Sequence, residues 1–295
     1  MLECFQDYFV NPTNKSDLKY SGTRQGGLWE SGLLISSDTE FKVINGVPYF
    51  ESDDQGDQFT LEDIDLWTKG GHFLRRWESK EKKVETPNEV YHSLCQKAAD
   101  LNLPIMDIAC GPNLGLIPDL IAKNPDLKFL ATDACSSLVY NWERFLTSQD
   151  ATANISLASF DATRMPIRSN SVDVITSHLG FSSIRYAGDE GMKGINEAYR
   201  VLRHGGYIFA IENMWTDRDA VLEVFRQWGR EPWLIFREDN LSWREKFEKA
   251  GFTIIEEKPQ LIRLLTPRDN SLGEAAFKFG IKIGLEYKAY MLQKD

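Results

Sequence analysis

The chain has 295 residues, enough for one large α/β unit with an extension or for two domains. Its 42% hydrophobic and 26% charged residues are typical of a globular protein, which excludes collagen-like, low-complexity and disordered classes. With 34 Lys and Arg against 44 Asp and Glu, the net charge of −10 has the wrong sign for neutralising phosphates, so we expect no nucleic-acid partner.

The apolar runs are short and the cysteines are scattered. No run approaches the ~18 uncharged apolar residues of a transmembrane helix, and the first residues lack the basic region of a signal peptide. We therefore expect a cytoplasmic protein without a transmembrane segment. Cys4, Cys95, Cys110 and Cys135 form no C-x-x-C pair, which predicts reduced core residues and no metal site.

Residues 1–58 are expected to form a small N-terminal β-hairpin unit. Two apolar runs within residues 41–50 flank Asn45 and Gly46, a pair that is typical of a tight hairpin turn. The acidic stretch that follows, residues 51–65, is interpreted as a solvated linker that leads into a helix.

Residues 59–295 have the periodicity of a layered α/β domain. Helical segments are expected over 60–77 and 86–101. Strands at 105–108, 129–132, 155–159, 172–176 and 207–211 are then expected to alternate with helices at 114–123, 136–147 and 190–202. A helix over 242–250, ended by Gly251, and strands over 252–257 and 285–292 complete the series. This alternation predicts a doubly wound, Rossmann-like sheet of seven mostly parallel strands with helices on both faces.

Three acids follow three successive predicted strands. The first strand ends in Asp107 and leads into a turn with Gly111 and Gly115, where free backbone N–H groups can face a ligand. The G-x-G-x-x-G pattern of a dinucleotide site is absent, which disfavours a nicotinamide-dependent oxidoreductase. Asp133 ends the second strand, where a carboxylate suits two ribose hydroxyls. Asp161 follows the third strand, where it can accept from an adenine amino group.

Four segments in register resemble the successive motifs of class I S-adenosylmethionine-dependent methyltransferases. They are Asp107-Ile108-Ala109-Cys110-Gly111-Pro112, Asp133-Ala134, the stretch 161–177 and the stretch 197–206. Their order and spacing match over residues 86–258, and the nearest resemblance is to the small-molecule branch that includes the ubiquinone and menaquinone methyltransferases. The resemblance implies methyl transfer from S-adenosyl-L-methionine to a small organic acceptor by in-line displacement, with S-adenosyl-L-homocysteine as product and no metal.

The same resemblance implies roles for individual residues. It places Asp107, Ala109, Gly111 and Asn113 around the methionine part of the cofactor, Asp133 and Ala134 at the ribose, Asp161 and Ala162 at the adenine, and Ser177 and His178 beside the sulfonium. Ala109 and Asn113 stand where the family usually has Gly. Alanine is tolerated at position 109 if φ is negative there, and asparagine, at position 113, is the non-glycine residue best suited to a positive φ.

The acceptor side of the site is less sharply defined by the sequence. His178 is either a general base near neutral pH or a hydrogen-bonded packing residue. Tyr186, Trp215 and Trp233 are candidate substrate contacts. The alternative for Tyr186 is a solvent-facing loop position. The alternative for the aromatic residues after the fifth strand is a helix over 221–228 whose apolar face packs on the sheet. Helical lid elements over the crevice are predicted at 59–85 and 215–240.

The N-terminal residues 11–18 and 44–50 resemble the small zinc-ribbon-like module that precedes some of these enzymes. The cysteine pairs of that module are absent, so a metal-free β unit is predicted. A second function stays open: a catalytically inactive sensor or partner subunit that binds S-adenosylmethionine or S-adenosylhomocysteine and uses the N-terminal unit for protein contacts. The sequence gives no signal for an oligomeric state.

Overall fold

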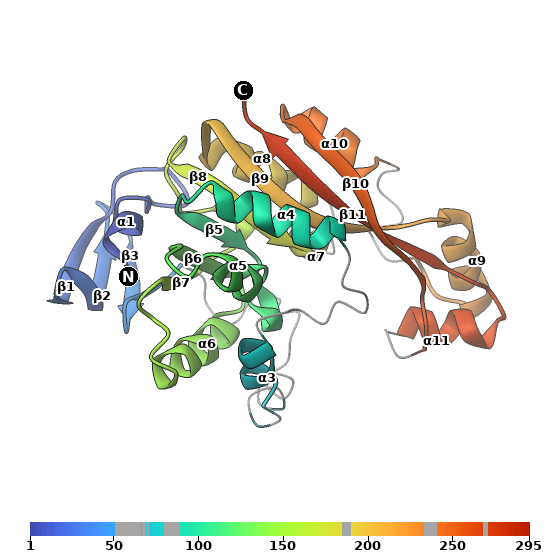
Figure 1. Cartoon of the computed structure of the whole chain (residues 1–295), viewed down its shortest axis with the longest axis horizontal. Helices are drawn as coiled ribbons and strands as arrows, with labels where there is room; N and C mark the ends of the chain where they lie inside the picture. Colours follow the sequence, from blue (N-terminus) through green and yellow to red (C-terminus); the bar gives the residue numbers. More distant parts are fainter. Residues whose placement is uncertain are drawn as a thin grey trace.

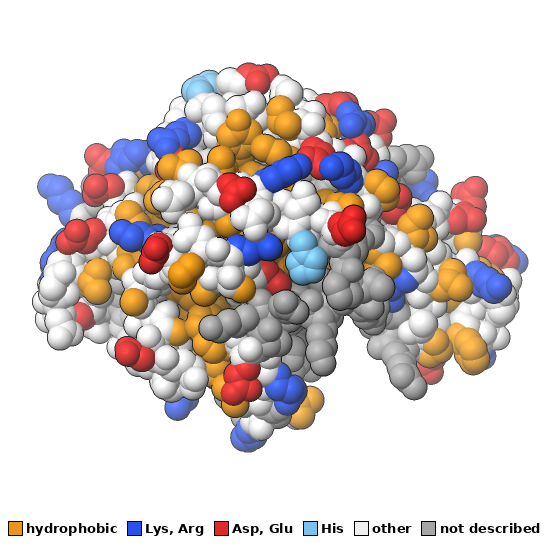
Figure 2. Space-filling view, in the orientation of Figure 1, with side chains coloured by type: hydrophobic (Ala, Val, Ile, Leu, Met, Phe, Trp, Pro, Cys, Tyr) orange, Lys and Arg blue, Asp and Glu red, His pale blue; other side chains and the backbone are white. Residues whose placement is uncertain are grey.

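A computed structural model describes residues 1–50, 66, 69, 71–79, 89–184, 190–232, 241–267 and 271–295. Within these residues, no helix combines the length and the apolar character needed to cross a membrane. On the face of the molecule drawn in Figure 2, Lys and Arg side chains are interspersed with Asp and Glu rather than gathered into one basic patch. The cytoplasmic location and the lack of a nucleic-acid partner stay predictions.

Parallel strands form the centre of the sheet, where the apolar runs of the sequence are buried. They are β5 (Ile105–Ile108), β6 (Phe129–Asp133), β7 (Ile155–Ser159), β8 (Val172–His178) and β9 (Leu202–Trp215). On one side of this centre, β11 (Gly284–Gln293) pairs antiparallel with β9, and β10 (Thr253–Leu264) pairs antiparallel with β11. Every residue of β5, β6 and β7 is buried, as expected for strands covered on both faces.

Helices pack on both faces of this sheet, so the predicted α/β architecture is confirmed. One face is covered by α4 (Glu89–Asp100), α5 (Ile117–Lys123) and α6 (Ser136–Ser148). The other is covered by α7 (Gly180–Ile184), α8 (Glu190–Val201) and α10 (Trp243–Ala250). Ser242 and Glu245 form a capping box that starts α10, and Gly251 ends it with φ of +100°, as the sequence predicted.

The N-terminal unit is a β-meander with one short helix. It consists of α1 (Glu3–Gln6), β1 (Lys19–Gln25), β2 (Leu28–Ile35), β3 (Glu40–Ile44) and β4 (Val47–Tyr49). Asn45 and Gly46 connect β3 to β4 with φ of +50° and +77°, which confirms the predicted tight turn. The rings of Phe9 and Phe50 stack with centroids 5.6 Å apart beneath these strands.

The N-terminal strands extend the central sheet. β4 pairs in parallel with β7 through Tyr49 and Ser159, and the Phe50 N–H donates to the Ser159 carbonyl at 2.8 Å. The described residues thus form one sheet of eleven strands, in the order β1-β2-β3-β4-β7-β6-β5-β8-β9-β11-β10, in which the four N-terminal strands continue the seven strands β5 to β11 (Figure 1). The physical reason is that β7 would otherwise be an edge with unpaired N–H and C=O groups. A domain boundary at residue 58 stays a prediction.

The C-terminal strands reach beyond the main body of the sheet. There, α9 (Arg218–Trp228) packs on α11 (Ser271–Lys278), a helix that the sequence analysis did not foresee (Figure 1, right). Val221, Val224 and Phe225 of α9 are buried in a hydrophobic cluster with Leu272 and Ala276 of α11. The predicted packing of this apolar face on the sheet is therefore wrong, because α11 covers it. The strands predicted over 252–257 and 285–292 are longer than expected because they extend to this pair.

Candidate functional site

The three acids predicted to converge lie at or just after the carboxyl ends of three adjacent strands. Asp107 lies in β5 and Asp133 ends β6, and these strands pair in parallel with Asp107 opposite Ala131. Asp133 is in turn opposite Ser159, the last residue of β7, and Asp161 follows two residues later. The fold therefore brings the backbone of all three acids to one end of the sheet.

The loop 109–115 between β5 and α5 is built from left-handed residues. Ala109, Gly111, Leu114 and Gly115 have φ between +51° and +58°, whereas Asn113 has no positive φ. The φ values at Ala109 and Asn113 are thus the reverse of what the residue types favour: the alanine is left-handed, and Asn113 ends a 3₁₀ turn that starts at Gly111. A left-handed non-glycine residue costs about 1–2 kcal/mol, so the surrounding contacts must hold this loop.

Asp107 provides part of that support from below. Its side chain is fully buried, and its Oδ2 accepts from the Thr176 hydroxyl at 2.6 Å and from the Leu116 N–H at 3.3 Å. A Cβ on Gly115 would lie 1.9 Å from Asp107 Oδ1, so only glycine fits above this carboxylate. Asp107 therefore points beneath the loop and ties it to the sheet.

Asp133 and Asp161 are each bonded to the backbone beside them. Asp133 accepts from the Gly111 N–H at 2.8 Å and from the Cys135 N–H at 3.0 Å, so it joins β6 to the loop. Asp161 caps the 3₁₀ turn Ala162–Arg164 and accepts from the Thr163 N–H and hydroxyl at 2.8 and 2.7 Å. Ala162 is buried, and Ala134 beside Asp133 is exposed.

Gly111 gives the clearest sign of space at this end of the sheet. A Cβ built on Gly111 would have no heavy atom within 4 Å, apart from its chain neighbours, so this backbone faces open space. The indole of Trp142, fully buried in α6, donates to the Gly111 carbonyl at 3.0 Å and fixes the residue from the opposite side. The loop is thus held on one side and open on the other.

The end of β8 carries Ser177 and His178. Ser177 is fully buried, and its hydroxyl donates to Glu212 Oε1 at 2.8 Å, so it faces the interior. His178 is half-buried, and its ring packs edge-on to Tyr91 of α4, with centroids 6.5 Å apart. Ser177 and His178, which the family resemblance places beside the sulfonium, therefore lie at adjacent positions but in different surroundings.

Glu212, in the neighbouring strand β9, was not identified as a site residue from the sequence. Its carboxylate is fully buried, and burial raises its pKa from 4.5 to about 7 although the Ser182 and Ser177 hydrogen bonds oppose this shift. The available signal was an acid that directly follows the apolar run 207–211.

Arg76 was also not identified as a site residue from the sequence. It belongs to α3 (His72–Ser79), which lies within the predicted lid element 59–85. Its Nε donates to the Asn113 carbonyl at 3.0 Å, and its Nη2 forms an ion pair with Asp119 of α5 at 2.6 Å, both side chains being about 5% exposed. The helix α3 is therefore attached directly to the loop.

The candidate substrate contacts are only partly covered by the described residues. Trp215 is half-buried against the cluster that α9 and α11 form. Tyr186 and Trp233 lie outside the described residues, as do residues 59–65, 67, 68, 70 and 80–85 of the first lid element and 233–240 of the second. The lid and these substrate contacts stay predictions.

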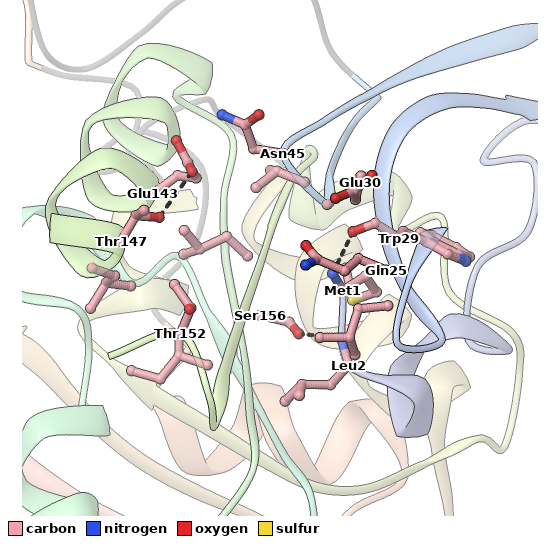
Figure 3. A pocket seen from close by; sticks show the side chains of 16 residues that line it. Met1, Leu2, Gln25, Trp29, Glu30, Asn45, Glu143, Thr147, Thr152 and Ser156 are labelled. Atoms are coloured by element: carbon pink, nitrogen blue, oxygen red, sulfur yellow. Dashed lines mark hydrogen bonds between the residues drawn. The ribbon is translucent and has the colours of Figure 1, made fainter. Parts of the chain in front are cut away.

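A cavity of about 530 Å³ lies elsewhere in the molecule, between the N-terminal unit and the β7 edge (Figure 3). Glu30, Asn45, Glu143 and Ser156 are among the polar residues around it, and the Leu2 N–H donates to the Ser156 hydroxyl at 2.9 Å. None of the described residues predicted for the cofactor or the acceptor lines it. The cavity is thus separate from the candidate site.

Comparisons with known proteins agree with the α/β fold of the chain. Residues 106–210 match the family model described as a methyltransferase domain. The fold is similar to that of a protein named as a sarcosine dimethylglycine methyltransferase from Galdieria sulphuraria, with 13% identity, a TM-score of 0.51 and coverage of 69% of this chain and 84% of that one. It is also similar to the MccD protein, with 16% identity, a TM-score of 0.51 and coverage of 70% and 97%. No curated protein matches the sequence.

The family match covers the loop, the acids and β8, which are the segments that the resemblance in the sequence rested on. The structural likeness, at these identities, concerns the fold. The match to a methyltransferase domain covers residues 106–210, and the α/β fold of the chain agrees with it.

Proposed function

We propose that the chain is an enzyme that transfers the methyl group of S-adenosylmethionine to a small organic acceptor by in-line displacement. The observation that carries the proposal is the placement of Asp107, Asp133 and Asp161 at the carboxyl ends of β5, β6 and β7, around an open loop. Crevices beyond the carboxyl ends of parallel strands are where α/β sheets bind their ligands.

The residues at these strand ends fit an adenosine cofactor. Asp133, with Ala134 beside it, would hold the ribose, because it ends β6 and accepts from the N–H of Gly111, whose backbone faces open space. Asp161 and Ala162 would lie along the adenine. Gly111 faces open space, so its backbone can approach the methionine part closely.

Other residues that the family resemblance assigns to the cofactor would act on it less directly. Asp107 is buried beneath the loop and would hold Ala109, Gly111 and Asn113 in place rather than contact the cofactor. Ser177 faces Glu212, so its backbone rather than its hydroxyl would border the sulfonium.

When bound, the cofactor supplies an electrophilic methyl group on its sulfonium. The chain's own contribution is to orient the acceptor and to exclude water, as in other reactions where geometry dominates the rate. His178, half-buried at the end of β8, would accept a proton from the acceptor where the acceptor carries one.

Isothermal titration calorimetry with S-adenosylhomocysteine tests the cofactor half of the proposal. The unaltered chain is expected to bind it and not to bind NAD. Asp133→Asn keeps the size of the side chain but removes the charge, which should weaken binding by about 10- to 100-fold, the equivalent of ~1.5–3 kcal/mol for bonds to a charged group. Asp126→Asn, at an exposed turn, is the matched control and should leave binding unchanged. Failure of the unaltered chain to bind would refute the proposal.

Incubation with methyl-labelled cofactor and a cell extract, followed by mass spectrometry, tests the transfer itself. We expect label in a small molecule. Cofactor binding without any transfer of label would instead favour the inactive sensor or partner subunit.

A further inference from the structure

The buried carboxylate of Glu212 has no part in the proposed function so far. Its Oε1 accepts from the Ser177 hydroxyl at 2.8 Å and from the Phe181 N–H at 3.2 Å. Its Oε2 accepts from the Ser182 N–H at 2.8 Å and from the Ser182 hydroxyl at 2.5 Å. Within the described part of the chain, no Lys or Arg forms an ion pair with it. Hydroxyl and amide donors alone therefore stabilise this charge.

All these donors belong to one segment, residues 177–182, which leads from the end of β8 into α7 and which we call the 177–182 turn. Leu179 in this turn is left-handed, with φ of +61°, and the Gly180 N–H donates to the Ser177 hydroxyl at 3.2 Å. A left-handed leucine costs about 1–2 kcal/mol, so the turn needs support from outside itself. Glu212 provides that support from β9.

The 177–182 turn also packs directly on the start of the loop 109–115. Ser177 is opposite Ile108 in the parallel pairing of β8 and β5. A Cβ on Gly180 would lie 2.5 Å from the Ile108 carbonyl oxygen and 3.4 Å from the Ala109 Cβ, so the backbones approach closely here. The next residues, His178 and Ala109, therefore lie next to each other where β8 and β5 end.

We propose that Glu212 is a positioning residue for the proposed methyl transfer, the function on which this inference rests. By holding the 177–182 turn against Ile108, Glu212 sets the position of His178 relative to the loop. Asp133 lies on β6, on the other side of β5 from this turn, so the ribose contact does not depend on Glu212. Loss of the Glu212 carboxylate should thus impair transfer much more than cofactor binding.

Glu212→Gln tests this directly. Glutamine keeps the shape of the side chain, but its NH₂ group is a donor that would face the hydroxyl and amide donors of the 177–182 turn. We expect S-adenosylhomocysteine affinity within about threefold of the unaltered chain, but transfer of label to an extract lower by about thirtyfold or more, since small misplacements of reacting groups have large effects. The imidazole NMR signals of His178, identified with His178→Gln, should shift, whereas those of His92 and His204 should not. The matched control is Glu143→Gln, another buried glutamate, which accepts from the Thr147 hydroxyl and borders the separate cavity.

Ser182→Ala is a milder second variant that keeps the carboxylate and the backbone donor. It should move the His178 signals in the same direction by a smaller amount, which keeps the inference testable if Glu212→Gln does not fold. Unshifted His178 signals in both variants would overturn the proposal, as would loss of cofactor binding in step with transfer. If the unaltered chain bound no S-adenosylhomocysteine, the proposed function itself would fail, and the positioning role with it. The His178 signals would then separately show whether Glu212 holds the turn.

Discussion

Replacing Glu212 by glutamine should change how the stability of the protein depends on pH. Burial raises the pKa of Glu212 from 4.5 to about 7 in the folded chain. The folded state thus binds a proton more readily than the unfolded state. The stabilisation that comes from protonated Glu212 is fully present below pH 4.5 and is lost as the pH rises through about 7. From pH 5 to pH 8 the loss amounts to about 2.5 kcal/mol in the free energy of unfolding.

The assay is urea denaturation of both proteins at several values between pH 5 and pH 8, followed by fluorescence and circular dichroism to test whether the transitions coincide. The glutamine side chain of the Glu212→Gln variant cannot titrate, so the difference in unfolding free energy between the two proteins isolates this group. Burial also raises the pKa of Tyr290, which interacts electrostatically with Glu212 and stays neutral in this range. A difference that is constant within about 0.5 kcal/mol across the range would refute the reasoning.

Three other substitutions test the loop and its supports. Arg76→Ala removes the guanidinium from Asp119, an almost fully buried partner, and should lower the free energy of unfolding by about 3–5 kcal/mol. In a double-mutant cycle with Asp119→Ala, the losses of the two single variants should not add. Additive losses would contradict the pairing. Ala109→Gly relieves a left-handed alanine and should stabilise the chain by up to ~1 kcal/mol after the entropy of the extra glycine, so a clear loss in urea denaturation would disprove the strain. Gly180→Ala places a Cβ 2.5 Å from the Ile108 carbonyl and should cost about 1–3 kcal/mol of unfolding free energy, whereas an unchanged transition would show that the backbones are not in contact.

The main alternation of strands and helices over residues 105–257 could be predicted from the sequence because it depends on local patterns, whereas α11 was not foreseen. Continuous apolar runs such as 207–211 are typical of buried strands, and Ser242 with Gly251 marks both ends of α10 through hydrogen bonds and a positive φ within a few residues. The pairing of β4 with β7 could not be predicted in this way, since the partners Tyr49 and Ser159 are far apart in the chain.

The loop 109–115 shows the limit of reasoning from residue types. Asparagine suits a positive φ better than alanine does, yet Ala109 is left-handed and Asn113 is not. The path of the chain between β5 and α5, with the Gly111 N–H bonded to Asp133 and the Asn113 carbonyl bonded to Arg76, decides the conformation. These tertiary contacts outweigh a preference of about 1–2 kcal/mol.

The sequence by itself determined that acids end or follow three successive strands, because parallel strands connected by helices must present their carboxyl ends at one edge of the sheet. Only the tertiary structure decided which way each side chain turns: Asp107 beneath the loop, Asp133 onto Gly111, and Ser177 toward Glu212. The reason is that the direction of a buried polar side chain depends on the donors it meets, and those donors come from distant segments that the fold alone brings together.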